Sequence, residues 1–385
     1  MAQRQFRSDD TSKWTHGFGN GSDGSITISA DTTYDGANAS CSGTADSTTL
    51  TLGAASTFAN GDLVMIHQTR GTGVGNWELN KIVDGGGGTT LTLQKSLINT
   101  YTDSGASQAQ IVEMKQYSSV TVNSAQTWSA PEWDGNVGGI IAFFCKDVTT
   151  VTGNISTNSR GFRGDTQNQA DEYGGADGGG EGTVNAAVNQ SQAANGNGGG
   201  GGDCEPNGST VRGGAGGGGH SAGGGNGTGL GGGTGGTGGT TAGVAALITM
   251  VFGGGGGGYE KTFAGAHVFD NGGDGGGIVL VISKTITVTG GITTTGQAGT
   301  AGADGGSGGG AGGSVLLKGQ TITLGTTLVT ALAGAGTTNS GAGSAGRIHA
   351  DYKNSISGTT NPTLDSTQDT TLNKIGTSGL ISNYW

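Results

Sequence analysis

Acidic residues are the first candidates for chemistry in this chain, because pairs of carboxylates carry out glycoside hydrolysis. The candidates lie in the middle of the sequence, at Glu132, Asp134, Asp165, Asp171 and Glu172. Nothing in their spacing selects one acid and one base. The five histidines are far apart and do not cluster with a nucleophile. We therefore expect that the protein is not an enzyme.

Motifs for metals and cofactors are missing as well. The chain has no H-E-x-x-H sequence and no phosphate-binding loop ending in Gly-Lys-Ser or Gly-Lys-Thr. The stretch FDNGGDGGG at 269–277 is not repeated in tandem, as a glycine-rich calcium-binding repeat would be. Cys41, Cys145 and Cys204 match no ligand spacing. We predict free thiols, no metal and no cofactor.

Aromatic residues beside glycine runs are the candidates for binding. Tyr173, Tyr259, Phe263 and Phe269 all flank such runs. If the runs pack as rods, these residues lie at the ends of the rods. Large aromatic side chains at exposed ends are good recognition elements because they bury much area at low entropic cost. The alternative is that they cap the rods without binding anything.

The elements that position these residues have the pattern of β-strands. Val, Ile and Thr alternate with polar residues between Gly, Asn, Asp and Ser, and no helical periodicity occurs. Three copies of one pattern, at 138–162, 276–300 and 312–336, each begin with Gly-Gly and an apolar strand. Stacked copies would bury apolar faces that one copy cannot bury alone. We predict an all-β fold with a parallel β-helix or β-solenoid scaffold, with a β-sandwich as the alternative.

The three copies also predict the alignment of the strands. A second strand follows a polar corner in each copy, and a short third strand then places Ile155, Ile292 and Leu328 at equivalent positions. The second and third copies are 36 residues apart, whereas the first precedes the second by 138. The sequence therefore indicates an insertion of roughly one hundred residues between two units of one stack.

The insertion is where glycine concentrates, among the 88 glycines of the 385-residue chain. GGGTGGTGGT at 231–240 has a period of three, and the apolar run VAALITMVF follows at 244–252. Polyglycine can form a left-handed helix with about three residues per turn, close to polyproline II. Such helices lack internal hydrogen bonds but can bond to one another side by side. We predict a polyglycine II bundle, with 244–252 as a loop at one tip or a plug.

Composition limits the partners and the location. The formal net charge of −11, without a basic stripe, argues against nucleic-acid binding. The longest apolar run is too short to cross a membrane, and the first ten residues have no secretory apolar region. Exposed sheet edges favour a trimer or a filament.

The sequence also predicts how the chain divides. The predicted divisions are a docking arm 1–20, a β domain 21–135, a repeat unit 136–170, the glycine-rich insertion 171–275, two repeat units 276–350 and a tail 351–385.

Glycine tracts broken by short variable loops, here over about 174–277, resemble the tip adhesins of some phage tail fibres. The flanking β-repeat is similar to phage fibre and spike proteins and to glycine-rich bacterial surface proteins. The resemblance implies a polyglycine II bundle whose end loops bind a host receptor or polysaccharide, in a virion whose other proteins hold the N-terminal arm. The alternatives are a bacterial extracellular surface or filament protein and, third, a polysaccharide-degrading β-helix enzyme.

Overall fold

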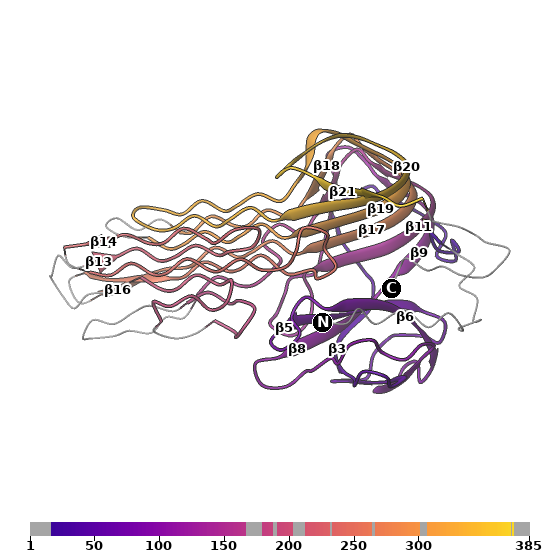
Figure 1. The fold of residues 1–385 in the computed structure, drawn as a ribbon, viewed down its shortest axis with the longest axis horizontal. Coiled ribbons are helices and arrows are strands. Elements are labelled where there is room, and N and C mark those ends of the chain that lie inside the picture. Colours follow the sequence, from indigo (N-terminus) through magenta and orange to yellow (C-terminus); the bar gives the residue numbers. More distant parts are fainter. Residues whose placement is uncertain are drawn as a thin grey trace.

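The computed structural model describes residues 17–166, 179–187, 191–202, 212–231, 233–263, 266–300, 306–370 and 372. In these ranges every regular element is a β-strand, which confirms the all-β class. Accordingly, the described residues contain no helix that is long and apolar enough to span a membrane. Three parts are visible in Figure 1: a stack of parallel strands, a small barrel beneath it and a long sheaf of glycine-rich segments.

The stack is a parallel solenoid with two ladders. The strands follow the order β1-β9-β11-β17-β19-β18-β12-β10-β2, and β20 and β21 continue from β19. Each coil adds one strand to each ladder, and β19 is long enough to belong to both. The strands are β1 (Ser25–Ile28), β2 (Thr32–Thr33), β9 (Lys115–Val122), β10 (Thr127–Ser129), β11 (Ile140–Val151), β12 (Asn154–Ser156), β17 (Ile278–Val288), β18 (Gly291–Thr293), β19 (Ser314–Thr330), β20 (Arg347–Asn361) and β21 (Asp365–Gln368).

The pairing confirms the predicted solenoid-like scaffold. All pairs in this sheet are parallel. An antiparallel β-sandwich, the alternative that the sequence left open, therefore does not form the scaffold. The register joins the predicted copies directly, since Ile140 pairs with Ile278 and Ile278 pairs with Ser314.

One residue of the predicted alignment is wrong. Ile292 pairs with Val329 and not with Leu328. The register of β19 shifts between Thr323 and Val329, where Gly325 and Thr327 have positive φ. The shift turns Val329 into the core and leaves Leu328 partly exposed. A bulge of this kind cannot be read from the apolar pattern, because both residues are aliphatic.

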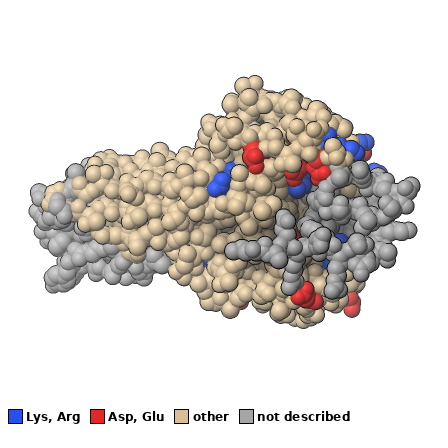
Figure 2. Space-filling model, viewed as in Figure 1, with Lys and Arg blue, Asp and Glu red and all other residues tan. Residues whose placement is uncertain are grey.

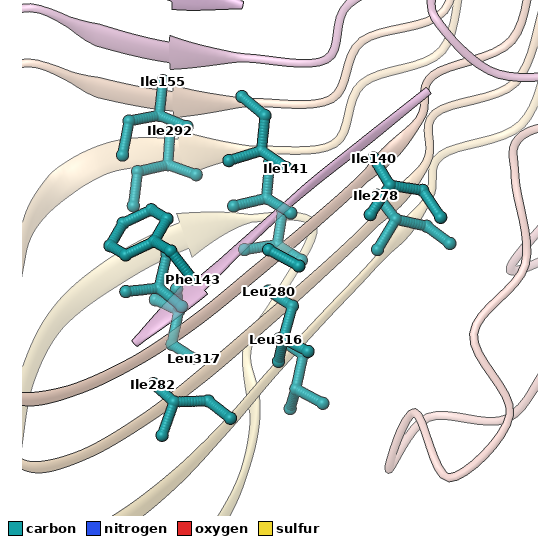
Figure 3. Packing of buried hydrophobic residues seen from close by; sticks show 14 of the residues in the cluster. Ile140, Ile141, Phe143, Ile155, Ile278, Leu280, Ile282, Ile292, Leu316 and Leu317 are labelled. Atoms are coloured by element: carbon teal, nitrogen blue, oxygen red, sulfur yellow. The ribbon is translucent and has the colours of Figure 1, made fainter. Parts of the chain in front are cut away.

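The core of the solenoid consists of stacked aliphatic side chains. Figure 3 shows Ile155 above Ile292, and Leu280, Leu316 and Leu317 from successive strands in the same cluster. The first six residues of β11 and of β17 are buried on both faces. One face points into the solenoid, and the other is covered by neighbouring parts of the chain. These near-continuous apolar runs are typical of parallel sheets that are covered on both sides.

An antiparallel barrel interrupts the solenoid between β2 and β9. Its strands close in the order β3-β4-β7-β6-β5-β8. They are β3 (Asn38–Ser42), β4 (Thr49–Leu52), β5 (Leu63–Arg70), β6 (Trp77–Asp84), β7 (Thr90–Leu93) and β8 (Gln108–Glu113). β5 faces two cores, because Val64 and Ile66 point into the barrel while Leu63 and Met65 join the solenoid cluster. β9 and β10 pair with β11 and β12 across the predicted boundary at 135; the division into domains stays a prediction.

The glycine-rich segments are joined by backbone hydrogen bonds between segments that are distant in the sequence. N–H groups three residues apart donate to the same neighbouring segment, and the two N–H groups between them donate to other segments. Each segment therefore has several neighbours around it. Over residues 253–257 the N–H groups donate, in chain order, from Gly253 to Gly276, from Gly254 to Gly219, from Gly255 to Glu181, from Gly256 to Gly273 and from Gly257 to Gly216.

The sheaf is larger than the predicted insertion 171–275. The connections from β18 to β19 and from β19 to β20 also enter it, since Gly308 donates to Gly257 and Gly341 donates to Ala215. Contact between backbones is close enough to exclude side chains. A Cβ placed on Gly256 would overlap the carbonyl group of Gly308. Glycine is therefore required here for packing, and not for a turn.

Candidate binding surface

The end of the sheaf that lies away from the solenoid carries two short two-stranded sheets (Figure 1). One pairs β13 (Arg212–Gly213) with β14 (Gly229–Leu230), and the other is a hairpin that pairs β15 (Tyr259–Phe263) with β16 (Ala266–Asp270). The strands of both sheets are direct continuations of glycine segments. Loops on a rigid support are the usual location of binding residues, because the support holds them in place. We call this region the distal end.

Three of the four predicted binding residues share the β15–β16 hairpin. Tyr259 begins the hairpin opposite Asp270, and Phe263 ends β15 opposite Ala266. Phe269 lies on β16 opposite Glu260. Tyr259 is 3% exposed, so its ring is packed in the bundle. The side chains of Phe263 and Phe269, and the whole of Tyr173, lie outside the described residues; their role in binding stays a prediction.

Hydrogen bonds hold the distal end to the rest of the sheaf. Thr228, next to β14, donates its N–H to Asn339 at 2.7 Å, and Asn339 belongs to the turn between β19 and β20. The Ser307 hydroxyl donates to the carbonyl of Asn271 at 2.6 Å, directly after β16. Turns from three separate excursions are thus tied together, which limits the freedom of the end as a whole.

A buried carboxylate joins the base of the sheaf to the other two parts. Glu181 follows a glycine run and is fully buried. It forms ion pairs with Arg70 of the barrel and with Arg163, which follows the β12 coil. The indole N–H of Trp133 also donates to Glu181, at 2.9 Å. Glu181 is not among the residues predicted from the sequence. Its signal there is a single acidic residue in the run GGGEG, where packing of a glycine segment requires no charge.

The apolar run 244–252 is a loop at the base of the sheaf. Leu247, Met250, Val251 and Phe252 are buried in the solenoid cluster, whereas Ile248 is 74% exposed. The run is therefore a loop and not a strand, and it lies between the barrel and the solenoid and not at the distal tip of the sheaf.

Two buried histidines hold this loop from opposite sides. His67 of the barrel donates from Nε2 to the carbonyl of Met250 at 2.9 Å, and His220 of the sheaf donates from Nε2 to the carbonyl of Val251 at 3.0 Å. Because a carbonyl only accepts, both rings carry their hydrogen on Nε2. Burial lowers the pKa of His67 to about 4 and the pKa of His220 to about 4. Both rings are therefore neutral at neutral pH.

A third histidine attaches the last short strand. His349 on β20 lies between Asp365 of β21, at 2.8 Å from Nδ1, and Asp351, at 3.1 Å from Nε2. Asp351 also pairs with Lys318. Burial opposes protonation of His349, but the hydrogen bonds and charges of the two carboxylates outweigh it and raise its pKa. The ring thus links β20 to β21 through the two carboxylates.

Three of the acidic residues considered for catalysis, Glu132, Asp134 and Asp165, lie in the part of the chain that the structure describes. Glu132 pairs with Arg160 at the surface, and Asp134 accepts backbone hydrogen bonds from a turn. Asp165 is buried, whereas Asp171 and Glu172 lie outside the described residues. Among the described residues no group of three potential ligands could hold a metal ion. Cys41 and Cys145 are buried free thiols.

Charge is unevenly distributed over the molecule. In the view of Figure 2 the coloured side chains gather on the solenoid and barrel, and the described surface of the sheaf is almost free of them.

No protein-family model and no curated protein matches this sequence. Weak structural similarity is found to three phage tailspikes. For gp61 of Pseudomonas phage phi297 the sequence identity is 12% and the TM-score 0.19, and the match covers 87% of this chain and 52% of that one. For gp54 of Acinetobacter baumannii bacteriophage AP22, in complex with capsular saccharide, the identity is 8%, the TM-score 0.20 and the coverage 89% and 58%; for gp49 of Pseudomonas phage LKA1 they are 11%, 0.17, and 90% and 67%. This chain spans between about half and two thirds of those chains.

Proposed function

We propose that this protein is a receptor-binding component of a phage virion, which recognises a polysaccharide or another receptor on the host surface through its distal end. One observation carries the proposal: a hydrogen-bonded sheaf projects from a β-solenoid and ends in short strand pairs and loops (Figure 1). The sheaf carries this end away from the scaffold (Figure 1).

We infer that the sheaf is a polyglycine II bundle. The support is the period of three in its hydrogen bonds, since the donors Gly253 and Gly256 share one neighbour and Gly254 and Gly257 share another. A helix with about three residues per turn directs successive N–H groups to three sides. A flat sheet would direct them to only two sides. The bundle is rigid because its segments bond to neighbours on several sides.

The protein acts by binding and not by catalysis. In support, the side chain of Glu132 is paired with Arg160 at the surface. The chain works as a trimer or a filament, in which the arm 1–20 contacts other virion proteins.

One observation favours the second candidate, a bacterial surface protein that forms filaments. β21 pairs only with His349–Tyr352 of β20, so the described part of the chain leaves the edge of β20 beyond Tyr352 without a second strand. An open edge in a parallel stack can continue into another copy.

The test is binding of the full-length protein to arrayed bacterial surface polysaccharides and to whole cells. Phe263→Ala with Phe269→Ala should weaken binding about tenfold, the effect of losing roughly 1.4 kcal/mol. The matched control is Ile98→Ala on the barrel, an exposed apolar side chain away from the distal end. Binding that is equal in both variants contradicts the proposal, and release of reducing sugars contradicts its non-enzymatic part. Open polymers in electron micrographs would support the filament protein instead.

A further inference from the structure

Two rows of hydroxyl side chains run across the first ladder of the solenoid. In six consecutive strands the sequence is hydroxyl-x-hydroxyl, with a single exception at Val148. The parallel register aligns these positions from strand to strand. The first row is Ser25, Ser119, Val148, Thr285, Thr321 and Ser355, and the second row is Thr27, Thr121, Thr150, Thr287, Thr323 and Ser357. We call these twelve positions the hydroxyl face.

The hydroxyl face is supported from behind by the core of the solenoid. The residue between the two rows points inward in every strand, and Val120, Ile286 and Ile322 belong to the core cluster. Figure 1 shows β9, β11, β17 and β19 side by side across this part of the solenoid. The register changes before the first row, between Cys145 and Val148 and between Gly319 and Thr321, and after the second row, beyond Thr323, but not between the rows. The face is therefore a regular array with a rigid support.

The spacing of the array follows from β-geometry. Neighbouring strands lie about 4.8 Å apart, and two residues along a strand advance about 6.7 Å. Threonine fixes its hydroxyl and its methyl group in few rotamers, because its side chain is branched at Cβ. The hydroxyl groups are thus ordered before any ligand arrives, and binding costs little further side-chain entropy.

The hydroxyl groups of this face are available to a ligand. Within the part of the chain that the structure describes, the hydroxyl groups of the second row take part in no hydrogen bond. In the first row only Ser25 and Ser119 do so: they bond to each other, and Ser25 also bonds to the hydroxyl of Ser118. The other ladder provides the contrast, since Thr293 there bonds to Ser156 and to Asn154. No charged residue occupies either row.

We propose that the hydroxyl face binds the surface of ice. A partner that uses the whole array must itself repeat in two dimensions, with an oxygen spacing close to the strand spacing. Water in crystalline ice meets both conditions and pairs with hydroxyl groups as donor and acceptor. A single saccharide chain repeats in one dimension only, and the two rows offer it no aromatic ring. This inference is independent of the proposed receptor binding at the distal end.

The test is partition of the full-length protein into slowly growing ice, with inhibition of ice recrystallisation as a second readout. Thr287→Tyr places a bulky ring in the centre of the face and should lower the ice-bound fraction about tenfold. Thr323→Tyr at a more exposed position should have the same effect, which guards against a folding defect of one variant. The control is Thr51→Tyr, an exposed strand threonine on the barrel.

Three results would overturn the inference. The first is wild-type protein that stays in the liquid as the control protein albumin does. The second is that the wild type and all variants partition alike. The third is an oligomer that Thr287→Tyr converts into monomers in sedimentation experiments, because the face would then be an interface between copies of this chain. None of these results would change the expected binding of polysaccharide by the distal end.

Discussion

At the scale of single residues, Glu181 connects the three parts of the molecule. Its two oxygens bind Arg70 of the barrel, Trp133, which precedes β11, and Arg163, which follows β12. A buried ion pair of this kind contributes little net stability when it is intact, but leaving one partner unpaired is costly. The residue therefore matters more for the relative position of the parts than for the stability of any one of them.

Removing Glu181 should destabilise the protein strongly. Glu181→Ala leaves the Arg70 guanidinium buried without its carboxylate, at an expected cost of about 3–5 kcal/mol in the free energy of unfolding. The control is Glu132→Ala, which removes the partner of Arg160 at a position where the glutamate side chain is 79% exposed; its cost should stay below about 1 kcal/mol. Urea denaturation of both variants measures the difference, and equal midpoints would contradict the role of Glu181.

The buried histidines make stability depend on pH. His67 and His220 have pKa values of about 4 in the folded protein, against 6.5 for a histidine in the unfolded chain. The unfolded state therefore takes up protons first, and stability is lost as the pH falls from about 6.5 to 4. At about 1.4 kcal/mol per pKa unit, each histidine accounts for roughly 3 kcal/mol of this loss.

The measurement is thermal unfolding at pH 7.5 and pH 4.5. His220→Gln should flatten the loss between these values, since glutamine takes up no proton. His349→Gln is the contrasting variant, because the pKa of His349 is raised. The stability that His349 contributes is complete below pH 6.5 and is lost as the pH rises through its folded pKa, so this variant should keep the acid-side loss. An unchanged pH profile in His220→Gln would argue against the neutral ring.

At the scale of elements, the glycine segments pack as closely as backbones allow. Most of their N–H groups donate to another segment and not within their own. This arrangement has no tolerance for a methyl group where two backbones touch. It contrasts with the solenoid strands, whose outward positions accept many side chains.

The contrast between two glycines tests this packing. Gly256→Ala should destabilise the protein by several kcal/mol, about the cost of overpacking a dense interior, because the new Cβ overlaps Gly308. Gly223→Ala is the matched control in the same sheaf, where the nearest atom to a Cβ is the carbonyl oxygen of Gly239 at 3.4 Å. It should be neutral or slightly stabilising. Chemical denaturation of both proteins decides the point; equal stability would contradict a packed sheaf.

At the scale of the whole molecule, the solenoid is the frame from which the other parts extend. The barrel occupies the connection between the first and second coils, and the sheaf collects the connections of the later coils. The base loop 244–252, held by His67 and His220, closes the space between them. A ligand at the distal end and a surface on the hydroxyl face can thus be engaged by one rigid body.

Much of the scaffold could be predicted from repetition. The Gly-Gly starts and apolar strands of the copies at 138–162, 276–300 and 312–336 determine both the stacking and the register at Ile140 and Ile278. The reason is physical: a repeated pattern buries its apolar face only against its own copies. The period of three in 231–240 likewise indicated glycine segments that pack side by side.

Only the tertiary structure decided the remaining features. The choice of Val329 over Leu328 depends on a bulge, and the role of Glu181 depends on two arginines that are far away in the sequence. The barrel closes through pairs between β3 and β8, which local patterns do not specify. Local sequence determines which faces are apolar and which segments, being glycine, have no side chains. Which distant segment covers each of them is set by the packing of the whole chain, where long-range contacts compete for the same surfaces.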